Sequence, residues 1–335
     1  MHRRVLVPAI ALTAAGALAL AGCSAAAPTD PGTSAPDGAT IQVVAVTDVY
    51  GDIAKQIGGD RVEVTSIVSG TAVDPHEYEA STRDQLAISE ADLVILNGGG
   101  FDDFMEQLVS ASGTGATVIE AVEVSGLLPE DAEAHDHEHE GEDADAEHAE
   151  EAGEEHEHHH IEGFNEHVWY SLHAVEHIAE AIEGALVELD PEGAADIQAA
   201  AAAFLGDLEA LHDRAHEVAD ELGGGEVVAT EPVSDYLLAD LGLEDVTPPD
   251  FLEAVEEGTG VGVGLLDEVL SLITDHGVRM LAENTQSEGP EAEQIRAAAQ
   301  AAGVPIVAFS ETLPSGEDYL SWMSSNIEAV ASALR

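Results

Sequence analysis

Three short segments of the chain carry side chains that could bind a metal ion. His76 follows an Asp-Pro pair, His167 stands in the string Asn-Glu-His-Val-Trp, and Glu231 stands in Thr-Glu-Pro. Imidazole nitrogens and carboxylate oxygens are suitable ligands for zinc, at about 2.0 to 2.2 Å. Taken singly, each of these residues could be an ordinary surface or core side chain. Their position beyond expected strands or loops favours a shared site, because ligands of open α/β sheets bind beyond the carboxyl ends of strands.

The elements that would position these residues alternate along the chain. Expected strands cover residues 41–46, 62–68, 93–96, 117–119, 227–230, 278–282 and 305–309. Expected helices cover residues 49–57, 83–90, 101–109, 190–222, 234–241, 265–275, 291–302 and 318–334. Alternation of this kind predicts an α/β fold with parallel sheets and crossover helices.

The longest helical segment, residues 190–222, divides this pattern into two halves. Its apolar side chains recur at steps of three and four residues, which indicates one continuous buried stripe. A helix of about 30 residues is about 45 Å long, enough to run along two domains. We therefore expect an N-terminal α/β lobe at residues 41–172, linking helices at 173–222 and a C-terminal α/β lobe at 223–335.

The N-terminus predicts export and lipid attachment. Arg3 and Arg4 precede an apolar stretch, and the string Leu-Ala-Gly-Cys ends at Cys23, the single cysteine of the chain. These are the parts of a secretory signal, and its end resembles a bacterial lipobox. We expect residues 1–22 to be a lipoprotein signal peptide, Cys23 to carry the lipid and residues 23–40 to be a flexible tether. The protein would then be held at the outer face of the cell membrane. An ordinary signal peptide with an incidental cysteine is the alternative.

The charge balance limits the classes of partner. The chain has 68 acidic residues against nine lysines and arginines, a formal net charge of -59. Such a chain repels phosphate backbones and attracts cations over long distances, so no nucleic-acid partner is expected. A solvated acidic surface suited to salt or solubility would account for most of these acids.

Residues 130–160 differ in composition from the rest of the chain. They consist almost entirely of Glu, Asp, His, Ala and Gly without apolar periodicity, which predicts a disordered insertion. Eight histidines of this insertion could form an auxiliary metal-binding loop: His135, His137, His139, His148, His156, His158, His159 and His160. We interpret the loop as a low-affinity collector or sensor for metal. A purely solvated insertion is the alternative.

Taken together, the motifs resemble those of the cluster A-I substrate-binding proteins of zinc and manganese ABC importers. Asp-Pro-His-Glu-Tyr-Glu around His76 resembles the first metal-ligand motif of that family, and Asn-Glu-His-Val-Trp resembles the second, usually Asp-Pro-His-Val-Trp. Thr-Glu-Pro around Glu231 resembles the third, and Asn97-Gly98 resembles the family's strand-end turn. The resemblance runs from about residue 41 to the C-terminus. It implies two lobes joined by a long helix, with metal bound in the cleft between them by His76, His167 and Glu231.

The resemblance leaves the fourth ligand open. The family often supplies a carboxylate from the loop after a strand of the C-terminal lobe, and here that loop contains Glu283 and Glu288. Glu283 is favoured because it lies at the expected end of the strand, whereas Glu288 or water is the alternative. Imidazole ligands and the general order of metal affinities favour Zn2+ over Mn2+ at such a site. Family members with glutamate at the third position include manganese binders, so Mn2+ is the second candidate.

The function implied by the resemblance is capture of Zn2+ for an ABC permease and its ATPase. The protein would be a monomer and not an enzyme, and the rigid linking helix predicts only a small closure around the metal. A surface zinc buffer or adhesin that acts through the histidine-rich loop is the alternative. A zinc hydrolase with Glu77 as general base would need an open coordination position, and it is the least favoured reading.

Overall fold

The first sheet of the molecule is built from the N-terminal part of the described chain. The computed structural model describes residues 40–335 except 73, 130–160, 162, 257, 276 and 288. The strands β1 (Ile41–Thr47), β2 (Val62–Val68), β3 (Leu93–Leu96) and β4 (Thr117–Glu120) form a parallel sheet in the order β2-β1-β3-β4. β3 reads Leu-Val-Ile-Leu and is buried along its whole length, as a strand covered on both faces should be.

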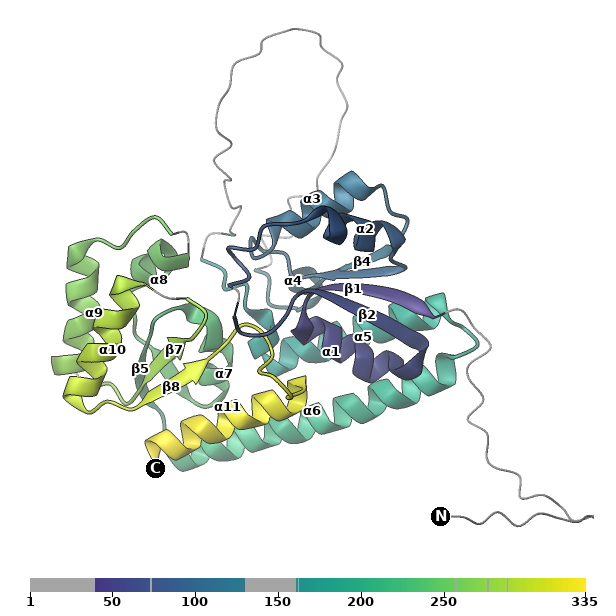
Figure 1. Ribbon diagram of the computed structural model, residues 1–335. Helices are drawn as coiled ribbons and strands as arrows, with labels where there is room; N and C mark the ends of the chain where they lie inside the picture. Colours follow the sequence, from purple (N-terminus) through teal and green to yellow (C-terminus); the bar gives the residue numbers. More distant parts are fainter. Residues whose placement is uncertain are drawn as a thin grey trace, which may run out of the picture. The chain divides into compact units, whose positions relative to one another are not determined.

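A second parallel sheet repeats this strand order. It contains β5 (Gly225–Ala229), β6 (Leu243–Asp245), β7 (Leu281–Asn284) and β8 (Ile306–Phe309) in the order β6-β5-β7-β8. In both sheets the strand order reverses at the strand that comes first in the chain, β1 in one sheet and β5 in the other. Ligands of such sheets bind at this point, beyond the carboxyl ends of the strands. We call the part around the first sheet the N-lobe and the part around the second sheet the C-lobe (Figure 1).

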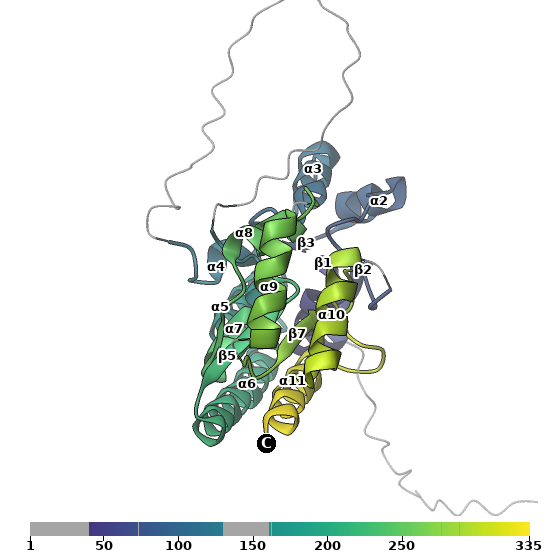
Figure 2. The same cartoon turned by 90° about the vertical axis from the view of Figure 1, so that its left-hand side faces the viewer.

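Helices pack around both sheets. Those of the N-lobe are α1 (Asp48–Gly58), α2 (Thr82–Glu90), α3 (Asp103–Ser112) and α4 (Ala121–Val124). Those of the C-lobe are α7 (Asp235–Asp240), α8 (Pro249–Glu256), α9 (Val263–Asp275) and α10 (Pro290–Ala302), of which α9 and α10 lie side by side (Figure 2). The sequence analysis missed β6, α4 and α8, because elements of three to eight residues are too short to show a clear period.

Three further helices connect the lobes. α5 (Leu172–Leu189) and α6 (Ala194–Leu222) pack against each other, and α11 (Tyr319–Leu334) lies along α6 (Figure 1). α6 has 29 residues and is therefore about 43 Å long. The expected continuous stripe is buried on it: Ile197, Ala201, Phe204, Leu208, Leu211, Ala215 and Val218. The helix begins at residue 194 rather than 190 because Asp190 stabilises a turn by accepting a hydrogen bond from the backbone N–H of Gly193.

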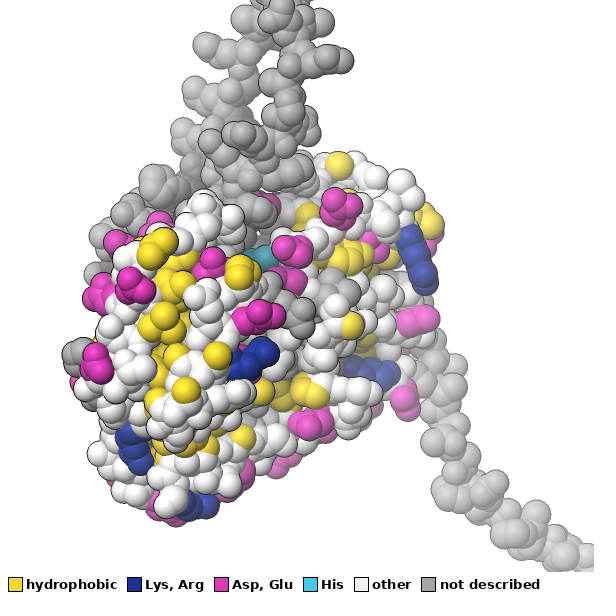
Figure 3. Space-filling view, turned by 60° about the vertical axis from the view of Figure 1, so that its left-hand side comes forward, with side chains coloured by type: hydrophobic (Ala, Val, Ile, Leu, Met, Phe, Trp, Pro, Cys, Tyr) yellow, Lys and Arg dark blue, Asp and Glu magenta, His cyan; other side chains and the backbone are white. Residues whose placement is uncertain are grey.

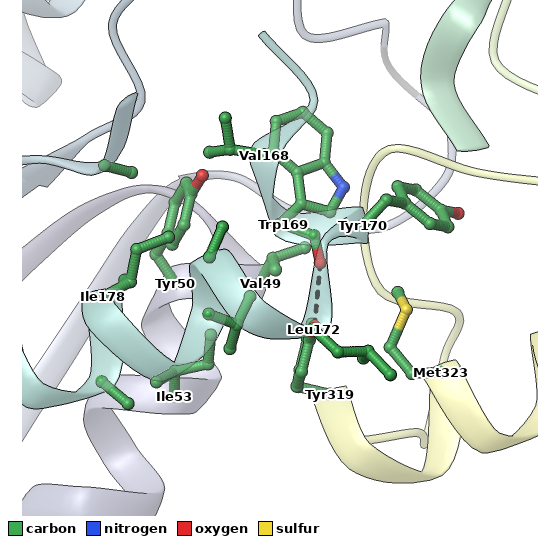
Figure 4. Close-up of a cluster of buried hydrophobic side chains, with 14 of the residues drawn as sticks. Val49, Tyr50, Ile53, Val168, Trp169, Tyr170, Leu172, Ile178, Tyr319 and Met323 are labelled. Carbon is green, nitrogen blue, oxygen red and sulfur yellow. Dashed lines mark hydrogen bonds between the residues drawn. The ribbon is translucent and has the colours of Figure 1, made fainter. Parts of the chain in front are cut away.

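The short helix η3 (Val168–Tyr170) connects the N-lobe core to α11. Trp169 and Tyr170 are fully buried in it, among side chains of α1, α5 and α11 (Figure 4). The Tyr319 hydroxyl donates to the Trp169 carbonyl at 2.8 Å, and the Tyr170 hydroxyl donates to the Ser310 carbonyl at 2.7 Å. These contacts fix the backbone that directly follows His167.

The two α/β lobes with parallel sheets and a long linking helix confirm the fold class expected from the sequence. In the described part of the chain, no helix combines the length and the apolar character needed to cross a membrane.

Two acidic side chains of the C-lobe, Asp235 in α7 and Asp245 in β6, lie close together. Burial raises the pKa of both, and the charge of Asp245 raises the pKa of Asp235 further. Thr247 donates two hydrogen bonds to Asp245 Oδ1, but Asp235 Oδ1 and Asp245 Oδ2 accept none within the described residues. A carboxyl whose pKa rises on folding stabilises the fold below its unfolded pKa, near 4, and this contribution is lost as the pH rises.

We expect Asp235→Asn to raise the free energy of unfolding at about pH 8 by on the order of 1–3 kcal/mol, because the amide carries no charge into the buried pair. At about pH 3 both carboxyls are protonated in the folded and unfolded chains, so the difference should vanish. Urea unfolding of the metal-free protein at both pH values measures this. Asp250→Asn, at an exposed position of α8, is the control, and an equal effect of Asp235→Asn at both pH values would contradict the interpretation.

Candidate metal centre

A cleft of about 800 Å3 is lined by residues of both lobes. The segment after β2 contributes His76 and Glu77, and the C-lobe contributes Glu231 after β5 and Glu256 of α8. The described lining residues include no lysine or arginine, whereas several are acidic. The space-filling view shows a histidine side chain between acidic side chains on this face (Figure 3). The cleft is therefore suited to a cation.

His76, His167 and Glu311 converge in this region. One possible ligand atom from each lies within 4.8 Å of the others. His76 Nε2 is 3.7 Å from Glu311 Oε2, and the centroids of the two imidazole rings are 5.7 Å apart. The Glu311 side chain is fully buried, and its Oε2 accepts no hydrogen bond within the described residues. Two imidazoles and a carboxylate at these separations could bind one metal ion with small side-chain adjustments.

Hydrogen bonds from Asn165 set the tautomer of His167. Asn165 Oδ1 lies 2.8 Å from His167 Nδ1 and also accepts from the backbone N–H of His167 at 3.0 Å. Asn165 Nδ2 donates to the Pro232 carbonyl at 2.8 Å, which identifies the other amide atom as the acceptor. His167 Nδ1 therefore carries the proton, and Nε2 presents a lone pair for a metal. The asparagine in the second motif, where the related family usually has aspartate, thus still orients the ring.

Aromatic rings pack against the two imidazoles. The Phe101 ring packs edge-on against His76 at 4.8 Å and against Trp169 at 4.9 Å between centroids. His167 packs against Trp169 at 5.1 Å. These contacts hold both imidazoles in fixed orientations before any metal arrives, which lowers the entropy lost on binding.

A single asparagine at the end of β7 connects the two carboxylates of the C-lobe. Asn284 Nδ2 donates to Glu231 Oε2 and, at 2.7 Å, to Glu311 Oε1. The Asn284 backbone N–H donates to Thr230 Oγ1, and its Oδ1 accepts from the backbone N–H of Gln286, so the amide cannot turn freely. Glu231 and Glu311 are therefore held together by one amide group.

The carboxyls of the cleft are protonated more readily than ordinary ones. Burial raises the pKa of Glu231 to about 7, with smaller contributions from the charges of Asp74 and Glu166. Burial also raises the pKa of Glu311 well above its usual value, helped by the charges of Asp74, Glu231 and Glu166. Because metal ligands must be deprotonated, a metal that enters this site displaces protons.

Two further acids lie beside His167. A possible ligand atom from each of Glu166, His167 and Glu256 lies within 4.8 Å of the others, and His167 Nδ1 is 3.9 Å from Glu256 Oε1. Glu166 is buried, and burial raises the pKa of Glu256. Because Asn165 already engages His167 Nδ1, we regard these acids as neighbours of the His76–His167–Glu311 site rather than as its ligands.

The structure does not bring Glu283 to the cleft. The expected strand 278–282 is shifted, and β7 runs from Leu281 to Asn284, so Glu283 lies inside the strand instead of after it. Adjacent residues of a strand point to opposite faces, so Asn284 faces Glu231 while Glu283 faces α10 and forms an ion pair with Arg296. The preference for Glu283 as fourth ligand therefore rested on a wrong strand end.

Several other expected site residues lie outside the described residues. They are Glu288, Cys23 and the histidines of the expected auxiliary loop: His135, His137, His139, His148, His156, His158, His159 and His160. These assignments stay predictions.

The sequence analysis missed Glu311 and Asn284. Glu311 stands two residues after β8, whose expected range of 305–309 was nearly right, so the strand-end rule that selected Glu231 would also have selected it. Gln286 fixes the backbone that carries Glu311. Its Oε1 accepts hydrogen bonds from the backbone N–H groups of Glu311 and Thr312, at 2.7 and 3.2 Å.

Comparison with known proteins shows which proteins the chain is similar to. A family model described as ZnuA, zinc-uptake complex component A, periplasmic, matches residues 43–333. The manganese-binding lipoprotein MntA of Halalkalibacterium halodurans is 33% identical over 201 residues, which are 60% of this chain and 56% of that protein. The zinc-binding lipoprotein AdcA of Streptococcus pneumoniae is 24% identical over 311 residues, 88% of this chain and 56% of that protein. The chain thus spans little more than half the length of both relatives.

Solved structures support the fold. The periplasmic zinc-binding protein TroA from Treponema pallidum superposes with a TM-score of 0.66 at 19% identity, over 88% of this chain and 99% of that chain. The named relatives include both manganese and zinc binders. The comparisons therefore relate the chain to proteins named as binders of metal ions, without favouring either of these two metals.

We expect Asn165→Ala to weaken metal binding by about 10- to 100-fold, because His167 loses the acceptor that fixes its tautomer. Asn165→Asp keeps an acceptor for the ring and should retain most of the affinity. Competitive titration of both variants with a chelating zinc indicator measures the effect. Equal affinities for the alanine and aspartate variants would contradict the orienting role.

Proposed function

The chain belongs to the ZnuA family of periplasmic zinc-uptake components, and from this premise we propose that it captures Zn2+ in its cleft and delivers it to the permease of an ABC importer. Proteins of this family are solute-binding components of ABC importers and not enzymes. The observation that carries the proposal is the convergence of His76, His167 and Glu311 at the acidic cleft, together with Glu231 of the cleft, which shares a hydrogen-bond donor with Glu311. We assign these four residues as the metal ligands.

Zinc is the metal that this donor set favours. Each carboxylate already uses one oxygen as acceptor for Asn284 Nδ2, and Ser287 donates a further hydrogen bond to Glu231. Hydrogen bonds of this kind favour binding of the metal through one oxygen of each carboxylate. Two imidazole nitrogens and two carboxylate oxygens then make four donors, which matches the four-coordinate preference of Zn2+. Mn2+ prefers six mainly oxygen donors and would need both oxygens of each carboxylate or added water.

The place of action follows from the relatives and the N-terminal sequence. MntA and AdcA are named as lipoproteins, and Leu-Ala-Gly-Cys ends at Cys23 in this chain. We propose that the protein is exported and anchored at the outer face of the membrane through Cys23. There it would meet the permease as a monomer, while the histidine-rich residues 130–160 would collect metal nearby.

A pair of matched variants tests the ligand assignment. We expect Glu311→Gln to lower zinc affinity by about 100-fold or more, because it removes a charged ligand at the centre of the site. Glu283→Gln makes the same chemical change in the same lobe, but it should leave affinity within about twofold, because Glu283 pairs with Arg296. Isothermal titration with Zn2+ in a competing chelator measures both. A larger loss from Glu283→Gln would restore Glu283 as the fourth ligand.

Asn284→Ala tests the preference for zinc. Without the amide, both oxygens of Glu231 and Glu311 can bind the same ion, so affinity for Zn2+ should fall more than affinity for Mn2+. We expect the ratio of zinc to manganese affinity to decrease by about tenfold. Thr285→Ala is the control, because Thr285 lines the cleft but its hydroxyl donates to the Phe309 carbonyl. If both affinities fall by the same factor, Asn284 has only a structural role.

A further inference from the structure

Asp48 lies at the carboxyl end of β1, where the strand order of the first sheet reverses. It is the first residue of α1, and Thr47 before it pairs with Val68, the last residue of β2. This pairing brings the Asp48 carboxylate next to the segment that follows β2, and its Oδ2 accepts from the backbone N–H of Gly70 at 2.8 Å. The same segment continues to His76, so Asp48 holds the start of the segment that carries one proposed ligand.

The other oxygen of this carboxylate contacts the segment that carries Glu311. Asp48 Oδ1 accepts from the backbone N–H of Leu313 at 2.9 Å, although the two residues are 265 positions apart in the chain. The two preceding N–H groups, those of Glu311 and Thr312, donate to Gln286 of the C-lobe instead. Three consecutive N–H groups are therefore divided between the lobes, and Asp48 is the acceptor that the N-lobe provides.

An aspartate suits this position because a carboxylate has two oxygens that can each accept a hydrogen bond. Hydrogen bonds from N–H groups to an ionised carboxylate are shorter and stronger than those to a neutral acceptor. Asp48 is half-buried, and burial raises its pKa, while the N–H groups of Leu313 and Gly70 act in the opposite direction and favour the charged form. An asparagine would keep one acceptor oxygen and would turn a donor toward the second N–H group.

We infer that Asp48 is a positioning residue of the metal centre: with one carboxylate it holds the segments of His76 and Glu311 at a separation that a single ion can bridge. The inference rests on the proposed function, in which both residues are ligands. His76 Nε2 and Glu311 Oε2, which come from different lobes, lie 3.7 Å apart. Because Asp48 fixes both segments, less conformational freedom is lost when an ion binds between these two atoms.

Asp52 provides a matched control, because it lies one turn later on α1 and accepts a hydrogen bond of the same kind. Its Oδ2 accepts from the backbone N–H of Tyr319 at 2.8 Å, eight residues beyond Glu311. We expect Asp48→Asn to weaken zinc binding by about fivefold and to speed zinc dissociation, since one hydrogen bond to a ligand segment is lost. Asp52→Asn should leave the affinity within about twofold. Competitive titration with a chelating zinc indicator, and release of zinc to excess chelator, measure both variants.

A double substitution separates positioning of a ligand from general stabilisation of the fold. In a Glu311→Gln background the ligand that Asp48 positions is already impaired, so Asp48→Asn should weaken zinc binding by a smaller factor than in the wild type. A merely structural role predicts the same factor in both backgrounds. Hydrogen exchange of the metal-free protein gives a second readout. Asp48→Asn should speed exchange of the Gly70 and Leu313 amides, whereas Asp52→Asn should not.

Three results would overturn the inference. They are wild-type zinc affinity in Asp48→Asn, an equal loss of affinity in Asp48→Asn and Asp52→Asn, and an equal effect of Asp48→Asn in both backgrounds. Asp48→Ser, which places a hydroxyl oxygen near the N–H groups, takes the place of Asp48→Asn if that variant does not fold. Absence of tight zinc binding by the wild-type protein is a separate outcome, because it removes the proposed function and this inference with it.

Discussion

Acidic side chains gather around the candidate metal site: burial and the charges of neighbouring acids raise the pKa of Glu231, Glu256 and Glu311, and Glu166 is one of these neighbours for all three. Two imidazoles lie among them, and the described residues that line the cleft include no lysine or arginine. Buried like charges of this kind are unfavourable unless protons or a cation neutralise them. In the absence of metal, protons must take that role. A divalent cation has to displace these protons when it binds, so its affinity should fall as the pH falls, and the remainder of the fold has to hold these groups together.

The fold holds the groups of the site together at the carboxyl ends of its parallel strands. Glu231 follows β5, Asn284 ends β7 and Glu311 follows β8, so the three meet at one edge of the second sheet. A side chain from a neighbouring strand end then fixes each backbone segment. Thr230 Oγ1 accepts from the Asn284 N–H, and Gln286 Oε1 accepts from the Glu311 N–H. In the N-lobe, Asn97 at the end of β3 has the same role, because its Nδ2 donates to the Glu166 carbonyl next to His167.

Much of this arrangement could be predicted from the sequence, and the failures have a physical cause. The long apolar stripe of α6 and the strands on either side of it were clear, and the structure brings His76 and His167 together as their motifs suggested. The strand end that led to Glu283 as fourth ligand was wrong, because hydropathy does not fix where a strand ends. β7 is set by its pairing with β5 and β8, and it extends to residue 284 rather than ending at 282, so Glu283 lies inside the strand instead of in the loop after it. Asn284 could not be found in advance, since its importance lies in two long-range hydrogen bonds and not in any local pattern.

The connections between the lobes determine how the site can respond to metal. Glu311 belongs by sequence to the C-lobe, yet the segment that carries it is fastened to the N-lobe. Asp48 of α1 accepts from the Leu313 N–H at 2.9 Å, and Asp52 accepts from the Tyr319 N–H at 2.8 Å. On the other side of the cleft, the Tyr236 hydroxyl donates to the Asn165 carbonyl at 2.7 Å.

A wide separation of the lobes would break these half-buried hydrogen bonds together, each at a cost of about 1 kcal/mol. It would also disturb the packing of α11 against α6, the long helix that links the lobes. Small movements of side chains and cleft segments avoid these costs. The metal can therefore be exchanged most readily by local rearrangement around ligands that remain close together.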